Sequence, residues 1–309
     1  MVEIRADLGL PLRAVHVDHG LHADSSQWSK HCRLLCRELG IPLVELEVDI
    51  VPTARTSLEE LAREARYRAI SAILQHGEML LLAQHGDDQV ETFLLQLLRG
   101  AGVAGLAAMP AVRPWQGGWM ARPLLEFTRR ELKDWANEEK LNWIEDPSNQ
   151  DIRMARNYLR REVIPDLRRR WPGLVGTIGR SAAHCGEAAQ ILREVAEADL
   201  EKSSPSPWQL SLSALQTLSR ARQRNLVRYW VRSRGICVPT RKALESLLEQ
   251  GTAAGEGAAP HLSWKGGEMR RYRDRLYLFP EALPELPQDV RLSWSGYDPL
   301  ILPEGLGTL

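Results

Sequence analysis

The feature that most constrains the fold is a regular alternation of short apolar runs and amphipathic stretches over the first 110 residues. The apolar runs of strand length are residues 12–17, 43–48 and 79–83. The stretches with helical spacing of apolar residues are 24–39, 57–73 and 88–98. This order predicts an α/β fold, a parallel sheet with helices on both faces. The run 79–83 has no polar residue, so we expect its strand to be buried on both faces.

The second half of the chain has a different pattern. Residues 175–200 predict one long helix, and the Ser- and Pro-rich segment 203–207 predicts a break. Residues 210–250 predict two helical pieces, and 261–280 a β-hairpin that turns at 265–267. We therefore expect a mainly helical second domain after the α/β domain. The predicted division is 1–175 for the α/β domain, 176–207 for a long helix and linker, 208–283 for the second domain, and 284–309 for a tail.

Composition excludes several classes of protein. There is no run of about 18 apolar residues, so no membrane span is predicted. The first residues have no basic segment followed by an apolar stretch, so we expect a cytoplasmic protein. None of the four cysteines forms a Cys-x-x-Cys pair, which argues against a zinc knuckle or a dithiol redox centre.

Positive charge is concentrated in two stretches although the net charge is zero. Residues 151–180 carry eight arginines and three acidic residues, and residues 220–242 carry eight basic residues and no acidic one. Basic stretches on a neutral protein are typical of a polyanion-binding face, and a solvated arginine-rich helix is the alternative. We predict a nucleic-acid contact at Arg224, Arg228 and Arg232.

Two polar clusters follow predicted strands, His16–Gly20 after the first and Gln84–Asp88 after the third. Ligands of such sheets bind beyond the carboxyl ends of the strands, so we expect both clusters at one site. Asp88 and Glu91 are three residues apart on one face of the following helix. Carboxylates there can hold Mg²⁺ or receive a cationic substrate, whereas a single acid would suffice to cap the helix.

Three further groups of residues are open to more than one interpretation. His16, His19 and His22 have a spacing that suggests a metal site, but packing and loop hydrogen bonds explain them better. The segment Glu59–Tyr67 places Arg63 and Arg66 on neighbouring turns, either as part of a salt-bridged helix or aimed at a phosphate. The arginines after the loop 143–151 can approach a triphosphate or a tRNA backbone.

These clusters together resemble successive motifs of the tRNA(Ile)-lysidine synthetases, whose catalytic domain is an adenine-nucleotide α-hydrolase fold of the PP-loop ATP pyrophosphatase class. The resemblance covers about residues 11–175 and rests on five segments: 16–21, 59–67, 85–92, 122–125 and 143–160. Residues 208–280 also resemble the first C-terminal, tRNA-contacting domain of that family. The block 143–160 separates this family from sulfur-inserting PP-loop enzymes.

The resemblance implies an activity. The family uses ATP to adenylate the C2 oxygen of cytidine 34 in the isoleucine tRNA with anticodon CAU, and then joins L-lysine there with loss of AMP. It implies that Asp88 and Glu91 lie at the lysine and Mg²⁺ site and that Arg63 and Arg156 approach ATP or the adenylated base. The other expected substrate- and ATP-binding residues are His16, Asp18, His19, Gly20, Glu59, Arg66, His85, Asp87, Asn157 and Arg160. The oligomeric state stays open, with a homodimer as one option.

The sequence departs from the family pattern in one respect. The family begins with a strand and a Ser-Gly-Gly-x-Asp-Ser loop whose backbone amides cradle pyrophosphate, and no such loop occurs in these 309 residues. The expectation is therefore a chain that lacks this first strand and the second C-terminal domain, keeps tRNA affinity and forms no lysidine. The alternatives are an inactive tRNA-binding remnant and another PP-loop tRNA-modifying enzyme.

Overall fold

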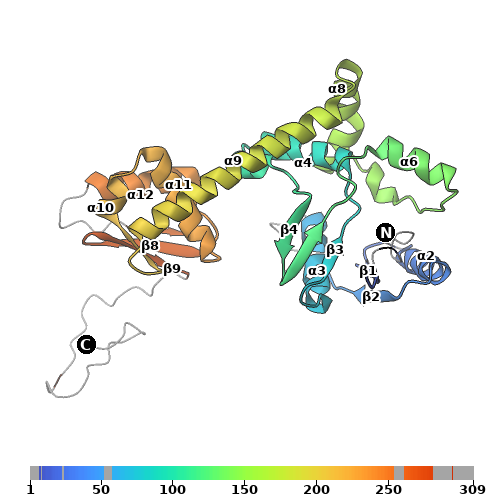
Figure 1. The fold of residues 1–309 in the computed structure, drawn as a ribbon, viewed down its shortest axis with the longest axis horizontal. Coiled ribbons are helices and arrows are strands. Elements are labelled where there is room, and N and C mark those ends of the chain that lie inside the picture. The colour runs from blue at the N-terminus through green and yellow to red at the C-terminus, as the bar shows by residue number, and fades with distance from the viewer. Residues whose placement is uncertain are drawn as a thin grey trace. The chain divides into compact units, whose positions relative to one another are not determined.

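The computed structural model describes residues 7, 9–22, 24–51, 58–253, 261–280 and 294, without the side chains of 59 and 250–253. The chain divides into two compact units, residues 1–186 and 187–309 (Figure 1). Ser57, the segment 254–260 and the tail 284–309, apart from Trp294, lie outside the described residues. No described helix is long and apolar enough to cross a membrane.

The first unit has the predicted parallel α/β architecture. Strand β1 (Ala14–Asp18) pairs in parallel with β2 (Leu43–Glu47), and β3 (Met79–Leu81) pairs in parallel with β5 (Gly118–Ala121). Strand β4 (Val112–Trp115) adds an antiparallel edge to β5. The strands form two separate hydrogen-bonded sheets within the described residues, β1-β2 and β3-β5-β4.

Helices follow the strands close to the predicted positions. Their bounds are Ser25–Glu38 for α2, Leu58–Ile73 for α3, Gly86–Leu98 for α4, Val103–Leu106 for α5 and Arg129–Glu138 for α6. Figure 1 shows β1 and β2 side by side next to α2. Helix α2 is followed by Gly40 in the left-handed region, at φ 62°, where a residue without a Cβ costs least.

The prediction that the third strand is buried on both faces was wrong for Met79, which is 51% exposed. Met79 is in register with Trp119, which is 45% exposed, so both lie on one face of the small sheet. The apolar composition indicated a buried strand, but it cannot tell which face a neighbour covers.

A series of helices carries the chain out of the first unit. It consists of a 3-10 turn at Pro147–Gln150, α7 (Ala155–Tyr158), a π-helical turn at Leu159–Val163, α8 (Ile164–Arg170) and α9 (Leu174–Ser203). Val90 on α4 packs with Leu159, Ile164 and Leu174 as a small buried apolar cluster. This cluster fixes the first turns of α4 against the π-helical turn.

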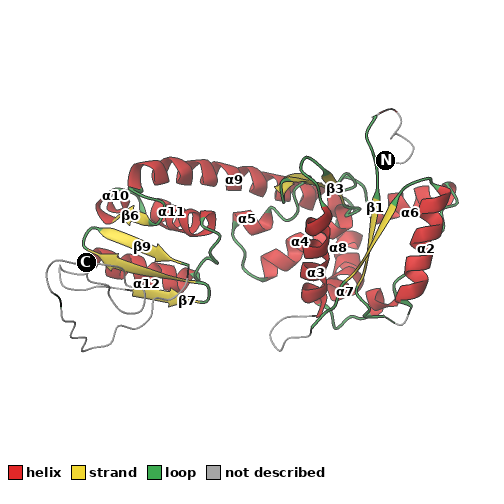
Figure 2. Cartoon of the chain, turned by 90° about the horizontal axis from the view of Figure 1, so that it is seen from below, coloured by secondary structure: helices red, strands yellow, loops and turns green. Residues whose placement is uncertain are grey.

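The second unit combines helices with an antiparallel sheet, seen together in Figure 2. Its helices are α10 (Leu212–Gln216), α11 (Arg220–Ser233) and α12 (Arg241–Ala253). Its strands are β6 (Gln209–Ser211), β7 (His261–Trp264), β8 (Gly267–Tyr272) and β9 (Arg275–Phe279), in the order β6-β9-β8-β7. The sequence predicted a single hairpin here, because the second turn, at 273–274, has no glycine.

Candidate active site

A cavity of about 2030 Å³ lies in the first unit. It is lined along one side by β1 and the residues before it, along another by residues 76–82 with β3, and also by residues of α3. Arg122 and Arg156 line it as well, together with Asp146, Ser148 and Arg153 of the loop after α6. Polar side chains from four separate parts of the chain therefore meet one cavity, which runs along the length of β1 and β3.

A cluster of carboxylates and arginines adjoins this cavity. The Arg160 guanidinium donates to Glu91 Oε1 at 2.6 Å, to Glu91 Oε2 at 3.0 Å and to Asp88 Oδ1 at 3.3 Å. Arg156 lines the cavity, donates to Thr92 Oγ1 at 3.2 Å and lies 3.8 Å from Glu91 Oε2. Arg156 thus links the cavity to the two acids.

The local sequence accounts for this geometry. Gly86 begins α4 in close contact with other segments, since a Cβ there would lie 2.6 Å from Val175 Cγ1 and 3.0 Å from the Phe127 carbonyl oxygen. Asp88 and Glu91 then share a helical face because they are three residues apart. Arg160 comes from the π-helical turn, a form of helix that occurs often at functional sites.

Glu91 is nearly inaccessible, with 1% of the residue exposed. Burial raises the pKa of Glu91 above its ordinary value, and the adjacent Arg160 and Arg156 act in the opposite direction. For Arg160 burial acts to lower the pKa, but its bonds to Glu91 and its proximity to Asp88 raise it on balance. The cluster therefore holds a buried carboxyl that is a better proton acceptor than a solvated one.

Asp87 has a positioning role. It accepts hydrogen bonds from the Arg129 backbone N–H at 2.8 Å and from the Arg168 guanidinium. One carboxylate therefore joins α4, α6 and α8. Arg168 was not predicted as a site residue; its place in the basic stretch 151–180 was the only signal in the sequence.

His16, Asp18 and His19, predicted at the end of β1, all line the large cavity but contact different partners. His16 lies within hydrogen-bonding distance of Ser29 Oγ, at 3.0 Å, and of Cys32 Sγ, at 3.6 Å, both on α2. His19 Nε2 lies 3.1 Å and 2.9 Å from two nitrogens of Arg66. Asp18 accepts from the Gly20 N–H at 2.8 Å, which lowers the pKa of Asp18 and holds Gly20 at φ 61°.

Other predicted residues divide between the cavity and the scaffold. Arg63 lines the cavity, while Glu59 begins α3 with a side chain outside the described residues. Asn157 is buried and donates to the carbonyl oxygens of Ser148 and Asp151, both at 3.0 Å, so it ties down the loop. Arg122 is 4% exposed, lines the cavity and donates to the Pro110 carbonyl oxygen at 2.8 Å, a role that sequence reasoning did not assign.

Two buried ring nitrogens, His19 Nδ1 and His85 Nδ1, have no hydrogen-bond partner within the part of the chain that the structure describes. Buried polar atoms are nearly always paired, so these two are suited to a ligand or water. His85 lies near two aspartates, with Nδ1 3.9 Å from an Asp87 carboxylate oxygen and Nε2 3.5 Å from an Asp88 carboxylate oxygen.

The donor set does not fit a Mg²⁺ ion at Asp88 and Glu91 in this arrangement. Three of the four carboxylate oxygens accept from Arg160, and Asp88 Oδ2 accepts from the His85 N–H at 3.1 Å. No group of three or more His, Cys, Asp or Glu side chains is gathered as a metal site among the described residues. A cation can bind these two carboxylates only where it displaces Arg160 from them.

The three arginines predicted to contact nucleic acid differ in exposure on α11. Arg224 is half-buried and donates to Glu245 Oε1 on α12 at 2.8 Å. Arg228 and Arg232 are exposed on the same helix. Arg224 therefore fastens α11 to α12, and the exposed positive charge comes from the other two.

Comparison with known proteins identifies both parts of the chain. Residues 1–167 match the family model of the PP-loop domain, and residues 210–277 match that of the TilS substrate binding domain. A tRNA(Ile)-lysidine synthase from Methylococcus capsulatus is 41% identical over 304 residues, 98% of this chain and 69% of the relative. One from Alkalilimnicola ehrlichii is 43% identical over 309 residues, 100% of this chain and 69% of the relative. One from Coxiella burnetii is 43% identical over 298 residues, 96% of this chain and 66% of the relative.

Proposed function

The chain belongs to the tRNA(Ile)-lysidine synthase family, and we propose that it uses ATP to join lysine to C2 of cytidine 34 in the isoleucine tRNA with a CAU anticodon. The observation that carries the proposal is the pair of buried Glu91 and half-buried Asp88, held by Arg160, with Glu91 linked through Arg156 to a cavity large enough for a nucleotide. The pair offers negative charge beside cavity-lining arginines, as a site that receives both a cationic amino acid and a polyphosphate requires.

The reaction has two steps. The C2 oxygen of cytidine attacks the α-phosphorus of ATP, and pyrophosphate leaves. The lysine side-chain amine, as the free base, then attacks C2; the C2–O bond breaks, AMP leaves with that oxygen, and the attacking nitrogen gives up a proton.

The side chains divide between these steps. We assign Arg63, Arg66 and Arg156 to the phosphates, because each lines the cavity and a guanidinium can donate two parallel hydrogen bonds to phosphate. We assign Asp88 and Glu91 to the lysine ammonium. The raised pKa of Glu91 suits it to accept the proton that the amine must lose before attack.

The remaining residues position these groups. Asp87, held by Arg168, fixes the start of α4, and Asn157 fixes the loop that carries Asp146 and Ser148 to the cavity. His19 and His85 each offer an unpaired ring nitrogen to substrate. Mg²⁺ stays a prediction, and no step above depends on its binding at Asp88 and Glu91.

For the chain as a whole, we propose that 1–175 is catalytic, 176–207 a long helix and linker, 208–283 the tRNA-contacting part and 284–309 a tail. Exposed Arg228 and Arg232 support the tRNA contact. A cytoplasmic location and a homodimer stay predictions.

The test is transfer of labelled lysine to an isoleucine tRNA transcript by the full-length gene product, with ATP present. Glu91→Gln keeps the side-chain size but removes the charge, and we expect kcat/KM to fall on the order of 100-fold. The matched control is Glu138→Gln, an exposed carboxylate on α6. Equal activity of the two variants, or lysine transfer without ATP, would contradict the proposal.

A further inference from the structure

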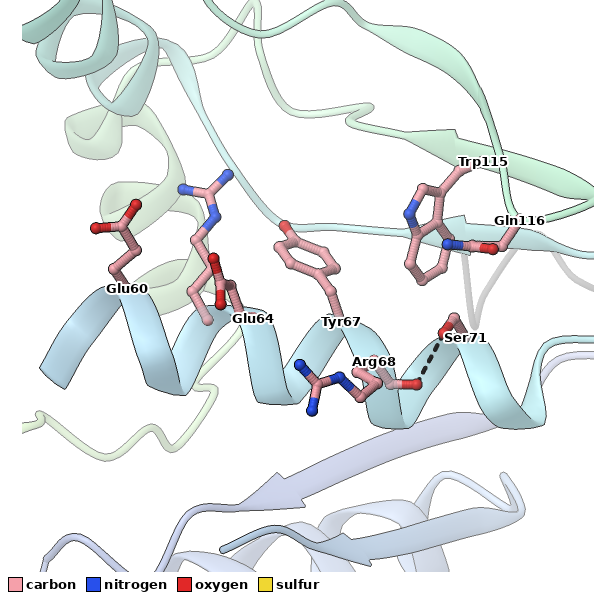
Figure 3. Close-up of a pocket in the computed structure, with 8 residues that line it drawn as sticks. Glu60, Glu64, Tyr67, Arg68, Ser71, Trp115 and Gln116 are labelled. Carbon is pink, nitrogen blue, oxygen red and sulfur yellow. Dashed lines mark hydrogen bonds between the residues drawn. The ribbon is translucent and has the colours of Figure 1, made fainter. Parts of the chain in front are cut away.

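A second, smaller pocket lies between α3 and the β4–β5 hairpin, with a volume of about 490 Å³ (Figure 3). Tyr67 projects from α3 toward Trp115 at the end of β4, and the two rings meet edge to face with centroids 5.8 Å apart. Both aromatic residues are half-buried. The pocket therefore has an aromatic floor that solvent can reach.

The hairpin backbone fixes the position of Trp115. The turn after it runs through Gln116 at φ 50° and Gly117 at φ 79°, the left-handed values that a tight hairpin turn requires. A Cβ at Gly118 would lie 2.2 Å from the Glu78 carbonyl oxygen, so only glycine allows the hairpin to approach β3 this closely. The strained turn and the close approach hold the indole over α3.

The charges around the aromatic pair are balanced. Arg63 and Arg68 line the pocket together with Glu60 and Glu64. The Arg63 guanidinium lies over the Tyr67 ring, 5.5 Å from its centroid. A ligand that is purely anionic would meet two carboxylates, and a purely cationic one would meet two guanidinium groups. A flat, uncharged ring with a phosphate at its edge suits this surface best.

Arg63 connects this pocket to the candidate active site, because it lines both the pocket and the large cavity. Adjacent nucleotides of an RNA strand share one phosphate. A guanidinium between the two sites can bind the phosphate that joins a nucleotide in the cavity to its neighbour in the pocket.

We propose that this pocket binds an unpaired base of the tRNA, one of the two that flank the modified cytidine, by stacking it on Trp115. The proposal rests on the proposed function for the identity of the RNA. Aromatic side chains bind unstacked bases in this way in single-stranded RNA recognition, and the stacking tolerates different bases.

The test measures binding of the CAU anticodon stem-loop to the full-length gene product. Trp115→Ala is expected to weaken binding about 5- to 150-fold, the usual range for loss of one stacked base. The matched control is Trp119→Ala, since Trp119 is 45% exposed and lies on the opposite face of the same hairpin. That variant is expected to bind as the unmutated protein does.

Abasic nucleotides, placed at one loop position at a time, identify the stacked base. An abasic nucleotide at one flanking position is expected to weaken binding to the unmutated protein as much as Trp115→Ala does, and to weaken binding to Trp115→Ala no further. Unchanged affinity of Trp115→Ala, or additive losses at both flanking positions, would overturn the proposal.

If Trp115→Ala does not fold, fluorescence measured with the unmutated protein still tests the proposal. A 2-aminopurine at the stacked position is expected to lose fluorescence on binding, and fluorescence that rises at both flanking positions would overturn the proposal. The outcomes also separate the two hypotheses. If the losses from Trp115→Ala and from the abasic nucleotide are non-additive but no lysine is transferred, the proposed function alone is refuted. If lysine transfer is normal but the two losses are additive, the base pocket alone is refuted.

Discussion

The two units of this protein differ in how they use buried groups. In the second unit, fourteen buried apolar side chains form one core that includes Trp230, Leu226 and Met269. In the first unit, the buried apolar cluster beside the candidate site contains four side chains, and charged groups occupy much of the rest of that region. Apolar burial stabilises without specifying a ligand, whereas burying a charge costs free energy unless the charge is paired and hydrogen-bonded.

A nearly inaccessible carboxylate bonded to an arginine occurs in each unit, and comparing one pair from each sharpens the contrast. Asp199 is 2% exposed and accepts from Arg222, and Glu91 is 1% exposed and accepts from Arg160. The Arg222 side chain is 49% exposed, whereas that of Arg160 is 23% exposed and also contacts Asp88. We infer that the Glu91–Arg160 pair serves chemistry and that the Asp199–Arg222 pair joins α9 to α11.

The largest expected effect is that of Arg160→Ala. It leaves Glu91 buried without its main partner, which typically costs about 3–5 kcal/mol, an upper limit here because Glu91 can take up a proton. We expect loss of lysine transfer and faster hydrogen exchange in the amides of α4. Arg160→Lys, which cannot form the two parallel bonds, is expected to recover stability in part and little activity.

The same truncation in the other unit is expected to act on stability alone. Arg222→Ala should lower the melting temperature and leave the rate of lysine transfer per folded molecule unchanged. If Arg222→Ala abolished transfer in folded protein, or if Arg160→Ala left transfer intact, the contrast between the two ion pairs would be wrong.

A smaller effect is expected from reversing the exposed charges of α11. Arg228→Glu with Arg232→Glu should weaken tRNA binding roughly tenfold and reduce the slope of log affinity against log salt by about 2, since two phosphate contacts are lost. Arg224→Glu should instead destabilise the unit, because Arg224 bonds Glu245. An unchanged salt slope in the double variant would mean that these arginines are only a solvated face.

A further effect concerns the protonation of His19. Burial and the nearby Arg66 lower the pKa of this side chain below the ordinary 6.5. The unfolded chain therefore takes up the proton first as the pH falls, so the stability that His19 contributes is present above pH 6.5 and is lost as the pH falls through its folded pKa. Arg66→Ala should raise this pKa in an NMR titration; an unchanged midpoint would contradict the contact.

The smallest effect is expected at Asp151. Hydrogen bonds from Arg153 lower the pKa of this exposed carboxyl from 3.8 to about 2. Its contribution to stability is present above pH 3.8 and lost as the pH falls through about 2. Arg153→Ala should raise the pKa part of the way toward 3.8 in an NMR titration, because the side-chain hydrogen bonds are lost while the backbone N–H of residue 153 still donates to Asp151. The melting temperature should change little, because both groups face solvent.

Much of the fold was predictable because apolar spacing reports local structure. The alternation over residues 12–98 gave the strands and helices of the first unit within one to three residues, and the long apolar spacing after 174 gave α9. The hairpin at 112–121 and the strand at 209–211 were not predicted, since three or four residues carry too little periodicity.

The candidate site was predictable only in part. The spacing of Asp88 and Glu91 placed them on one face, but nothing local indicated that Arg160 would bond both or that Arg168 would bond Asp87. Such partners are 69 to 81 residues away in sequence and are set by the packing of α4 against α7 and α8. His16 faces α2 rather than Arg66 because it packs with Ser29, which strand spacing alone cannot reveal.

We propose that the first unit carries the chemistry and the second contacts the tRNA. This division is tested most directly by measuring two quantities on the same two variants. For Glu91→Gln and for the Arg228→Glu, Arg232→Glu pair, we would measure the dissociation constant for the isoleucine tRNA and the single-turnover rate of lysine transfer at saturating tRNA. We expect Glu91→Gln to lower the rate on the order of 100-fold with an unchanged dissociation constant. We expect the Arg228→Glu, Arg232→Glu variant to raise the dissociation constant with an unchanged rate. A lower rate together with a higher dissociation constant in Glu91→Gln, with the protein folded, would contradict this division.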